Sequence, residues 1–265
     1  MESEHGDLAA EMTRRCRKAL SLLAAAAFPH FCCSCGTEGK IVCGGCAADA
    51  IAPLKGIFVC PGCGVPSPLG ALCGRPKCRK ATPLDGSVAA ASYGSPVPRE
   101  LLRLCKYERV SEARDALAAM FAAFARRHAA ALEEITAGGV IVPVPMHPFR
   151  EAYRGFNQAT ILAETLGRET GTPVSEVVLK RRFRWSTQAV LEDDGARRMN
   201  ARGSVIGRAV KEGSSFVLVD DVATTGATLA ACARALKDGG AGRVWAVTLL
   251  RGSKNRPASR DGVRR

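Results

Sequence analysis

The chain has 265 residues, 47% of them hydrophobic, and carries a formal net charge of +13 at pH 7. This is the composition of a globular protein with room for one medium-sized domain and a small module, and no apolar stretch is long enough to span a membrane. The charge favours anionic partners, either nucleic acid or a substrate with several phosphate groups, and does not choose between them.

The N-terminal segment has four basic residues between positions 14 and 18, followed by the apolar run Ala19–Phe28. This order is typical of a signal peptide, or of an amphipathic helix that ends at Pro29. The helix is favoured because the cysteines that follow resemble metal ligands, which must be free thiolates. Residues 1–30 are therefore predicted to form a helical segment of a cytoplasmic protein.

Residues 31–82 form a cysteine-rich segment. Ten of the twelve cysteines precede residue 80, and eight of them make four pairs: Cys32 and Cys35, Cys43 and Cys46, Cys60 and Cys63, Cys73 and Cys78. Three pairs have the spacing at which a tight turn directs two sulfurs at one ion. Eight thiolates are enough for one or two structural zinc ions, which predicts a single or double zinc ribbon. A disulfide framework or unliganded thiols are the alternatives, and the spacing leaves the ligand pairing open.

From residue 83 to 252, apolar strands alternate with helices, which predicts an α/β domain with a parallel sheet flanked by helices. The predicted strands are Ser87–Tyr93, Gly139–Val144, Glu176–Leu179, Phe216–Val219 and Val244–Leu250, and the predicted helices are Pro98–Tyr107, Ala113–Leu132, Asn157–Gly167 and Ala227–Lys237. Near the end of the first helix, Lys106 is placed either to reach a phosphate or to face solvent. The basic stretch 253–265 is predicted to be a disordered tail.

A proline-rich loop follows the predicted strand Gly139–Val144. The loop and the turn after it contain the candidate binding residues Pro145, Met146, His147, Arg150 and Arg154. Ligands of open α/β sheets lie outside the carboxyl ends of the strands, so we expect this loop to face the ligand cleft. The histidine is interpreted as a structural residue and not as a general base.

The stretch Phe216–Leu229 is the most informative part of the chain. An apolar strand is followed by Asp220 and Asp221, a short loop of small residues and a helix. A helix N-terminus at this place offers N–H groups to a phosphate, and ionised aspartates accept hydrogen bonds from the hydroxyls of a ribose. The pattern predicts a site for a 5-phosphorylated ribose, with a phosphate loop made of Ala223, Thr224, Thr225, Gly226, Ala227 and Thr228.

This stretch has two other interpretations. The first is an ordinary strand–turn–helix unit whose acids cap the helix. The second is the acidic strand of an ATP-binding site, which needs a glycine-rich loop with a lysine that this sequence lacks.

The segment Val219–Gly226 resembles the phosphoribosyl diphosphate (PRPP) motif of type I phosphoribosyltransferases. The string R-G-F-N-Q-A at 154–159, with V-P-V-P at 142–145, resembles the ComF family more narrowly. That family joins an N-terminal zinc module to a type I phosphoribosyltransferase domain, and its F-P-x-x-C-x-x-C entry matches residues 28–35. The resemblance extends over about residues 20–252 and indicates a ComFC-like protein.

The resemblance implies a role for each candidate segment. Asp220 and Asp221 would hold the ribose hydroxyls of PRPP together with magnesium, and residues 223–228 would hold its 5-phosphate. The loop with Arg150 and Arg154 would bind the pyrophosphate group. Arg181 and Gln188 would belong to a hood that closes over PRPP. The arginines around position 181 are equally consistent with a solvated basic face, and Trp185 stands where the family usually has threonine.

The implied function is transfer of a phosphoribosyl group from PRPP to an unidentified acceptor, with release of pyrophosphate and a link to DNA uptake. The alternative is a non-catalytic, zinc-containing adaptor of the competence machinery that binds single-stranded DNA. Expected partners are therefore PRPP, single-stranded DNA or competence proteins. The acceptor and the oligomeric state cannot be predicted from the sequence.

Overall fold

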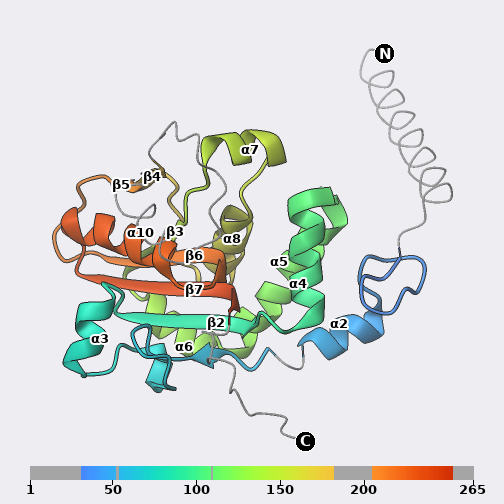
Figure 1. Ribbon diagram of the computed structural model, residues 1–265, viewed down its shortest axis with the longest axis horizontal. Coiled ribbons are helices and arrows are strands. Elements are labelled where there is room, and N and C mark those ends of the chain that lie inside the picture. The colour runs from blue at the N-terminus through green and yellow to red at the C-terminus, as the bar shows by residue number, and fades with distance from the viewer. Residues whose placement is uncertain (1–30, 52–53, 109, 182–204, 253–265) are drawn as a thin grey trace, which may run out of the picture. The chain divides into compact units, whose positions relative to one another are not determined.

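The computed structural model describes residues 31–51, 54–108, 110–181 and 205–252 (Figure 1). The predicted N-terminal helix, the predicted C-terminal tail and Gln188 lie outside these residues. The chain divides into two compact units, residues 1–47 and 48–265. In the first unit the described part contains a cysteine-rich turn and the start of α2 (Gly44–Ile51). The second unit contains the sheet and the other cysteine-rich turns.

The second unit is built on a five-stranded sheet with the order β1-β2-β7-β6-β3. Its strands are β1 (Ile57–Phe58), β2 (Gly86–Ser92), β3 (Gly139–Pro143), β6 (Ser215–Ala223) and β7 (Arg243–Arg251). Strands β2, β7, β6 and β3 are parallel to one another. Strand β1 is antiparallel to β2 and comes from the cysteine-rich segment. The predicted parallel sheet is confirmed, with one antiparallel edge strand added.

Helices cover both faces of the sheet. Helix α10 (Ala227–Asp238) packs Cys232 and Leu236 against alternate residues of the strands, among them Leu218. Because successive side chains of a strand point to opposite faces, Ile141 points away from this cluster, and Gly167 of α8 (Gln158–Thr170) lies close to it. Helix α8 therefore covers the other face. The remaining helices are α3 (Pro76–Ala81), α4 (Pro96–Arg103), α5 (Ser111–Arg127), α6 (Ala129–Thr136) and α7 (Pro148–Arg154).

Two predicted elements differ from the observed ones. The helix predicted over 113–132 is divided into α5 and α6 at His128, whose backbone is not helical and whose Nε2 lies 3.2 Å from the carbonyl oxygen of Leu54. The strand predicted at 176–179 begins instead at Leu179: β4 (Leu179–Arg181) pairs with β5 (Val205–Gly207) as a separate two-stranded ribbon. A 3-10 turn, η1, spans Pro68–Gly70.

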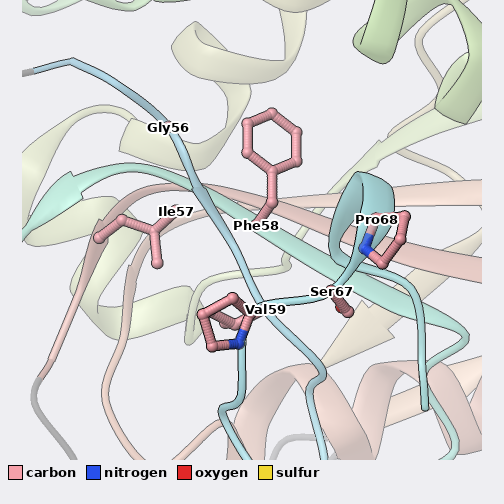
Figure 2. A pocket seen from close by; sticks show the side chains of 7 residues that line it. Gly56, Ile57, Phe58, Val59, Ser67 and Pro68 are labelled. Atoms are coloured by element: carbon pink, nitrogen blue, oxygen red, sulfur yellow. The ribbon is translucent and has the colours of Figure 1, made fainter.

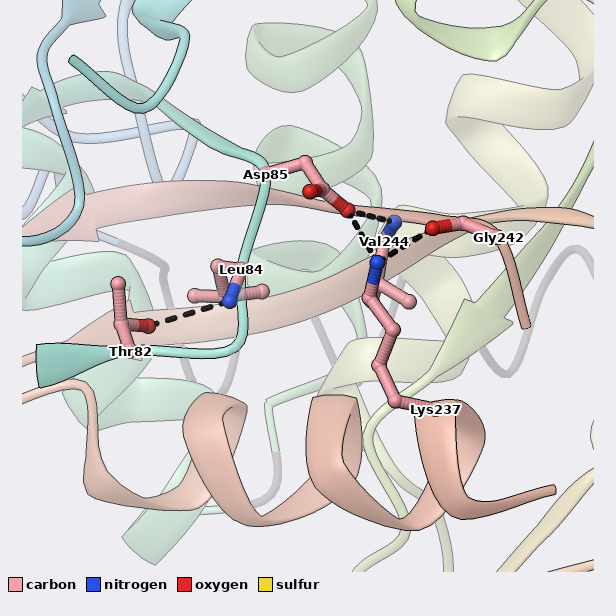
Figure 3. Close-up of polar contacts among 6 residues, drawn as sticks. All are labelled: Thr82, Leu84, Asp85, Lys237, Gly242 and Val244. Atoms are coloured by element: carbon pink, nitrogen blue, oxygen red, sulfur yellow. Dashed lines mark hydrogen bonds and ion pairs between the residues drawn. The ribbon is translucent and has the colours of Figure 1, made fainter. Parts of the chain in front are cut away.

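Asp85 ties the entry of β2 to the rest of the sheet (Figure 3). Its Oδ2 accepts hydrogen bonds from the backbone N–H of Val244 and from Nζ of Lys237, both at 2.7 Å. The same Nζ donates to the carbonyl oxygen of Gly242. One carboxylate thus joins β2, β7 and α10, so the segment that leads out of the cysteine-rich turns is held against the sheet.

Candidate functional site

The paired acids, Asp220 and Asp221, lie near the carboxyl end of β6. The strand continues past its predicted end because Asp220 and Val222 still pair with Thr248 and Leu250 of β7. The loop then turns at Gly226, whose φ of +74° is a conformation that residues with a side chain rarely adopt. The hydroxyl of Thr225 accepts a hydrogen bond at 3.3 Å from the N–H of Ala227, where α10 begins. The predicted strand–loop–helix unit is therefore present.

The two acids have different surroundings. Desolvation by the surrounding protein, and then the negative charge of Asp221, raise the pKa of Asp220 to about 8, although a backbone N–H from Asp221 lowers it in part. That N–H donates to Oδ1 of Asp220 at 2.8 Å. At neutral pH the carboxyl group of Asp220 is therefore largely protonated.

The charge on Asp221 is paired with Lys106. Lysine Nζ lies 2.5 Å from Oδ2 of the aspartate, and the two side chains are only 21% and 16% exposed. Lys106 reaches this point because α4 ends in a π-helical turn, η2 (Leu104–Glu108). Such single turns are frequent at functional sites. The structure thus places Lys106 at the acids, a position that the sequence left open.

Arg181 brings a second cation to the acids from the ribbon β4–β5. Burial lowers its pKa, the positive charge of Arg150 lowers it further, and Asp220, where it is ionised, raises it. Arg181 is therefore within electrostatic range of both Arg150 and Asp220. The fold thus brings Arg181 into the electrostatic range of an arginine of α7 and an acid of β6 that are far from it in sequence.

The proline-rich loop forms one wall of a cleft of about 250 Å³. Pro145 and Met146 line this cleft together with Arg181. The loop is anchored by Asn157, whose Nδ2 donates to the carbonyl oxygen of Val144 at 3.0 Å and whose Oδ1 caps α8.

Two of the predicted loop residues have other contacts. Arg154 Nη1 lies 3.5 Å from the side-chain oxygen of Gln158, and the ring of His147 stacks on Phe149 with centroids 5.8 Å apart. Their predicted part in ligand binding, like that of the other loop residues, stays a prediction.

The eight predicted zinc ligands gather into two quartets. The first consists of Cys32, Cys35, Cys43 and Cys46, and the second of Cys60, Cys63, Cys73 and Cys78. Within each quartet the sulfurs lie within 4.8 Å of one another. Sulfurs bound about 2.3 Å from a tetrahedral zinc ion are separated by about 3.8 Å, and the observed separations of 3.5, 3.6 and 3.8 Å match this value. The ligand pairing that spacing left open is therefore sequential.

Both quartets are built on the same backbone turn. Cys32 and Cys60 each accept a bond at their carbonyl oxygen from the N–H of the glycine four residues later, Gly36 and Gly64. These glycines have φ of +71° and +77°, which explains why glycine follows Cys35 and Cys63. In the second quartet Gly62 also passes so close to Cys78 that a Cβ there would lie 2.7 Å from the cysteine Cβ.

The thiols are prepared to bind a cation. Burial raises the pKa of Cys60, but backbone N–H groups of Cys73, Cys63 and Gly62 outweigh this and lower it to about 6. Backbone N–H groups lower the pKa of Cys32 to about 6 in the same way. Neighbouring thiols and burial raise the pKa of Cys78 to about 12, so a metal that binds through this sulfur must displace its proton. Among the described cysteines none forms a disulfide, and each quartet fits a structural zinc ion.

A second hollow lies beside the edge strand β1 (Figure 2). It is lined by Gly56, Ile57, Phe58, Val59, Pro66, Ser67 and Pro68. None of these side chains titrates or carries a charge, so this hollow offers little chemistry. None of the helices in the described ranges is both long and apolar enough to cross a membrane.

The parallel sheet, with paired acids at the end of β6, is the setting in which the family described as "Phosphoribosyl transferase domain" matches residues 152–265. The DNA utilization protein YhgH of Escherichia coli K12 is 32% identical over 195 residues, which cover 73% of this chain and 84% of YhgH. The chain belongs to this family of ComF-like proteins.

Other relatives match shorter stretches. Competence protein ComFC of Bacillus subtilis is 36% identical over 114 residues, covering 42% of this chain and 44% of ComFC. Competence protein F of Haemophilus influenzae is 36% identical over 91 residues, covering 34% of this chain and 40% of that protein. Among solved structures, a hypoxanthine phosphoribosyltransferase from Staphylococcus aureus matches this chain with 11% identity and a TM-score of 0.28. The match covers 58% of this chain and 64% of that enzyme chain.

Proposed function

We propose that this protein binds PRPP with magnesium and transfers its phosphoribosyl group to an acceptor, releasing pyrophosphate. The observation that carries the proposal is the ion pair of Lys106 with Asp221 at the end of β6, directly before the loop that leads into α10, with Arg181 within electrostatic range of Asp220. Acids that accept from ribose hydroxyls and cations that hold phosphates are the complementary groups for this ligand.

The proposed reaction breaks the bond between ribose C1 and the diphosphate oxygen. The electron pair of that bond leaves with pyrophosphate, and the acceptor forms a new bond to C1 and gives up its proton. Because positive charge develops on the ribose and negative charge on the leaving group, the protein acts chiefly by positioning and electrostatics. Arg150 and Arg181 would offset the leaving charge. Asp220 and Asp221 would hold the ribose hydroxyls, and magnesium, when bound there, would neutralise the diphosphate.

Lys106 would exchange its partner when the ligand binds, from Asp221 to the phosphates. In the ligand-free state its ammonium group occupies Asp221, which the ribose hydroxyls also need. Arrival of magnesium and PRPP brings a competing cation to the aspartate and a competing anion to the lysine. We therefore expect the ion pair to open as the ligand binds, with Lys106 turning toward the phosphates.

The test is thermal unfolding with magnesium and PRPP. A ligand at a hundredfold excess over its dissociation constant stabilises a protein by about 2.7 kcal/mol, which is a rise in Tm of about 5–10 °C for a unit of this size. Asp221→Asn should remove this rise, whereas Asp238→Asn, an exposed acid at the end of α10, should keep it. A wild-type Tm that ignores PRPP would refute the proposal, and pyrophosphate release with a panel of acceptors would identify the reaction.

A second candidate function is binding of single-stranded DNA. It is favoured by the net charge of +13 and by relatives named for DNA utilization and competence. Binding through phosphates should weaken with salt, with a slope of about −0.7 in log–log form for each phosphate contacted. An affinity that does not change with salt would argue against this function. The two functions are compatible, because a fold does not determine a biological role.

A further inference from the structure

Arg251, the last residue of β7, reaches the second cysteine quartet with its side chain. Its Nη2 lies so close to Gly64 that a Cβ added at that glycine would be 3.8 Å from it. Gly64 closes the turn of the quartet, because its N–H donates to the carbonyl oxygen of Cys60 at 2.8 Å. The negative charge of Cys60 acts on the guanidinium group of Arg251. The arginine is therefore a neighbour of the quartet, although the two are far apart in sequence.

The second quartet needs a positive charge beside it. Four thiolates around one zinc ion carry a net charge of about −2, and Cys60 and Cys78 are 0% and 4% exposed. A buried charge is costly unless it is paired and hydrogen-bonded. The N–H of Cys73 contacts Sγ of Cys60 at 3.3 Å, and Arg251 adds a full charge. None of the ion pairs among the described residues includes this arginine, and its Nη1 contacts only an uncharged hydroxyl, that of Ser87, at 3.5 Å.

The backbone of Arg251 is tied to the start of the phosphate loop. Arg251 pairs with Ala223 at the end of β6, and the N–H of the next residue, Gly252, donates to the carbonyl oxygen of Ala223 at 2.8 Å. Gly252 packs so closely on the loop that a Cβ there would lie 3.2 Å from Cα of Thr224. The carbonyl oxygen of Arg251 accepts from the N–H of Tyr93 at 2.8 Å. One residue thus joins the quartet to the loop after the paired acids.

The quartet and the phosphate loop also face each other. Pro61 and Gly62, which lie between two quartet cysteines, line the same cleft of about 340 Å³ as Thr224 and Thr225. Arg251 lines this cleft as well. The metal turn, the arginine and the loop therefore belong to one packed region of the second unit.

We propose that Arg251 is the outer-sphere partner of zinc in the second quartet, and that zinc bound there holds the phosphate loop in place through this arginine. The second quartet is then a control element of the ligand site, because loss of its zinc releases Arg251 and loosens residues 223–228. The link from zinc to the loop does not depend on what the loop binds. Its consequence for ligand affinity rests on the proposed function.

The first test is the zinc affinity of the full chain, measured by competition with a chromophoric chelator. Removal of an outer-shell partner lowers metal affinity by about 10–100-fold, so Arg251→Met should weaken one of the two zinc sites by about tenfold or more. Arg251→Lys keeps the charge and should restore most of that loss. Arg243→Met is the matched control, because Arg243 begins the same strand and is exposed, and both zinc affinities should stay unchanged in it. Equal zinc affinities of Arg251→Met and Arg243→Met would overturn the inference.

The second test leaves Arg251 in place, so it decides the question even if Arg251→Met does not fold. Amide hydrogen exchange of residues 223–228 is followed before and after chelation. Cys35→Ser keeps only the second zinc, and its removal should speed exchange in the loop by about tenfold or more, while β3 stays protected. Cys63→Ser keeps only the first zinc, and its removal should leave exchange in the loop unchanged. Loop exchange that ignores the second zinc, or that rises together with exchange in β3, would overturn the inference.

The two proposals fail separately. If loop exchange responds to the second zinc and PRPP does not raise the Tm of the wild type, the proposed function falls and the link from zinc to the loop stands. If PRPP binds the wild type, and removal of zinc from Cys35→Ser changes neither loop exchange nor PRPP affinity, only the present inference falls.

Discussion

Lys106 and Asp221 make an ion pair that is mostly buried, and this has a measurable consequence for stability. Removing one member of a buried pair leaves the other charge without a partner. We expect Lys106→Met and Asp221→Asn each to lower the free energy of unfolding by about 1–3 kcal/mol at pH 7. The double variant should lose less than the sum, with a coupling of about 0.5–3 kcal/mol in a urea double-mutant cycle.

The control for this cycle is the pair Arg126–Glu169. Its atoms are equally close, at 2.6 Å, but the arginine side chain is 61% exposed. Exposed pairs couple by less than about 1 kcal/mol. A coupling between Lys106 and Asp221 no larger than that of the control pair would contradict a mostly buried ion pair between these two side chains in the ligand-free protein.

Asp220 gives a prediction about pH. Below about pH 4 its carboxyl group is protonated in both the folded and the unfolded chain and contributes nothing to the pH dependence. As the pH rises, the unfolded chain releases the proton first, whereas the folded chain holds it until about pH 8. Rising pH therefore lowers the free energy of the unfolded state relative to the folded state. This residue's contribution to stability should fall as the pH rises from about 4 to 8 and then level off.

Asp220→Asn should remove that contribution, because the amide does not titrate. The variant should gain stability relative to the wild type at pH 8 and much less at pH 5, as measured by chemical denaturation at each pH. Asp238→Asn, at an exposed position, should follow the wild-type profile. A wild-type minus variant difference that is constant with pH would contradict the raised pKa.

At the scale of elements, local patterns predicted what local interactions decide. A short segment was enough to predict β6, its loop and α10: the apolar run Phe216–Val219, the two acids after it and Gly226. Hydrophobic patterns and a positive φ at glycine are properties of short segments, so they can be predicted without the rest of the fold. The C-x-x-C pairs predicted metal sites for the same reason. Their assignment to quartets required the folded chain, since spacing along the sequence does not report distance in space.

The elements that sequence did not predict depend on tertiary contacts. The π-helical turn that carries Lys106 to Asp221 has no sequence signal, because any helical pattern accommodates one inserted residue. The break between α5 and α6 arises where His128 contacts Leu54, a residue of the cysteine-rich segment. Strand β1 is too short to give a period and exists because it pairs with β2.

At the scale of the whole molecule, the two quartets belong to different compact units. The first lies within residues 1–47, whereas the second lies in the unit that holds the sheet. The second quartet is also continuous with that unit, because β1 just before it pairs with β2, and the segment after it is held by Asp85 (Figure 3). Two similar metal sites should therefore contribute differently to the stability of the main unit.

Cys63→Ser and Cys35→Ser test this difference with the same chemical change at equivalent positions of the two turns. The wild type should contain two zinc ions per chain, one for each quartet, and each variant should contain one. Losing a structural metal is among the changes that cost several kcal/mol. In Cys63→Ser that cost falls on the unit with the sheet, so its Tm should drop by about 5 °C or more, at about 2–4 °C for each kcal/mol. In Cys35→Ser the main transition should keep its Tm, because the lost site lies in the other unit.

Chelator titrations should agree: release of one zinc should leave the main transition unchanged, and release of the other should lower it. Equal losses of Tm in the two variants would contradict this division, and they would mean that the first quartet supports the sheet as strongly as the second.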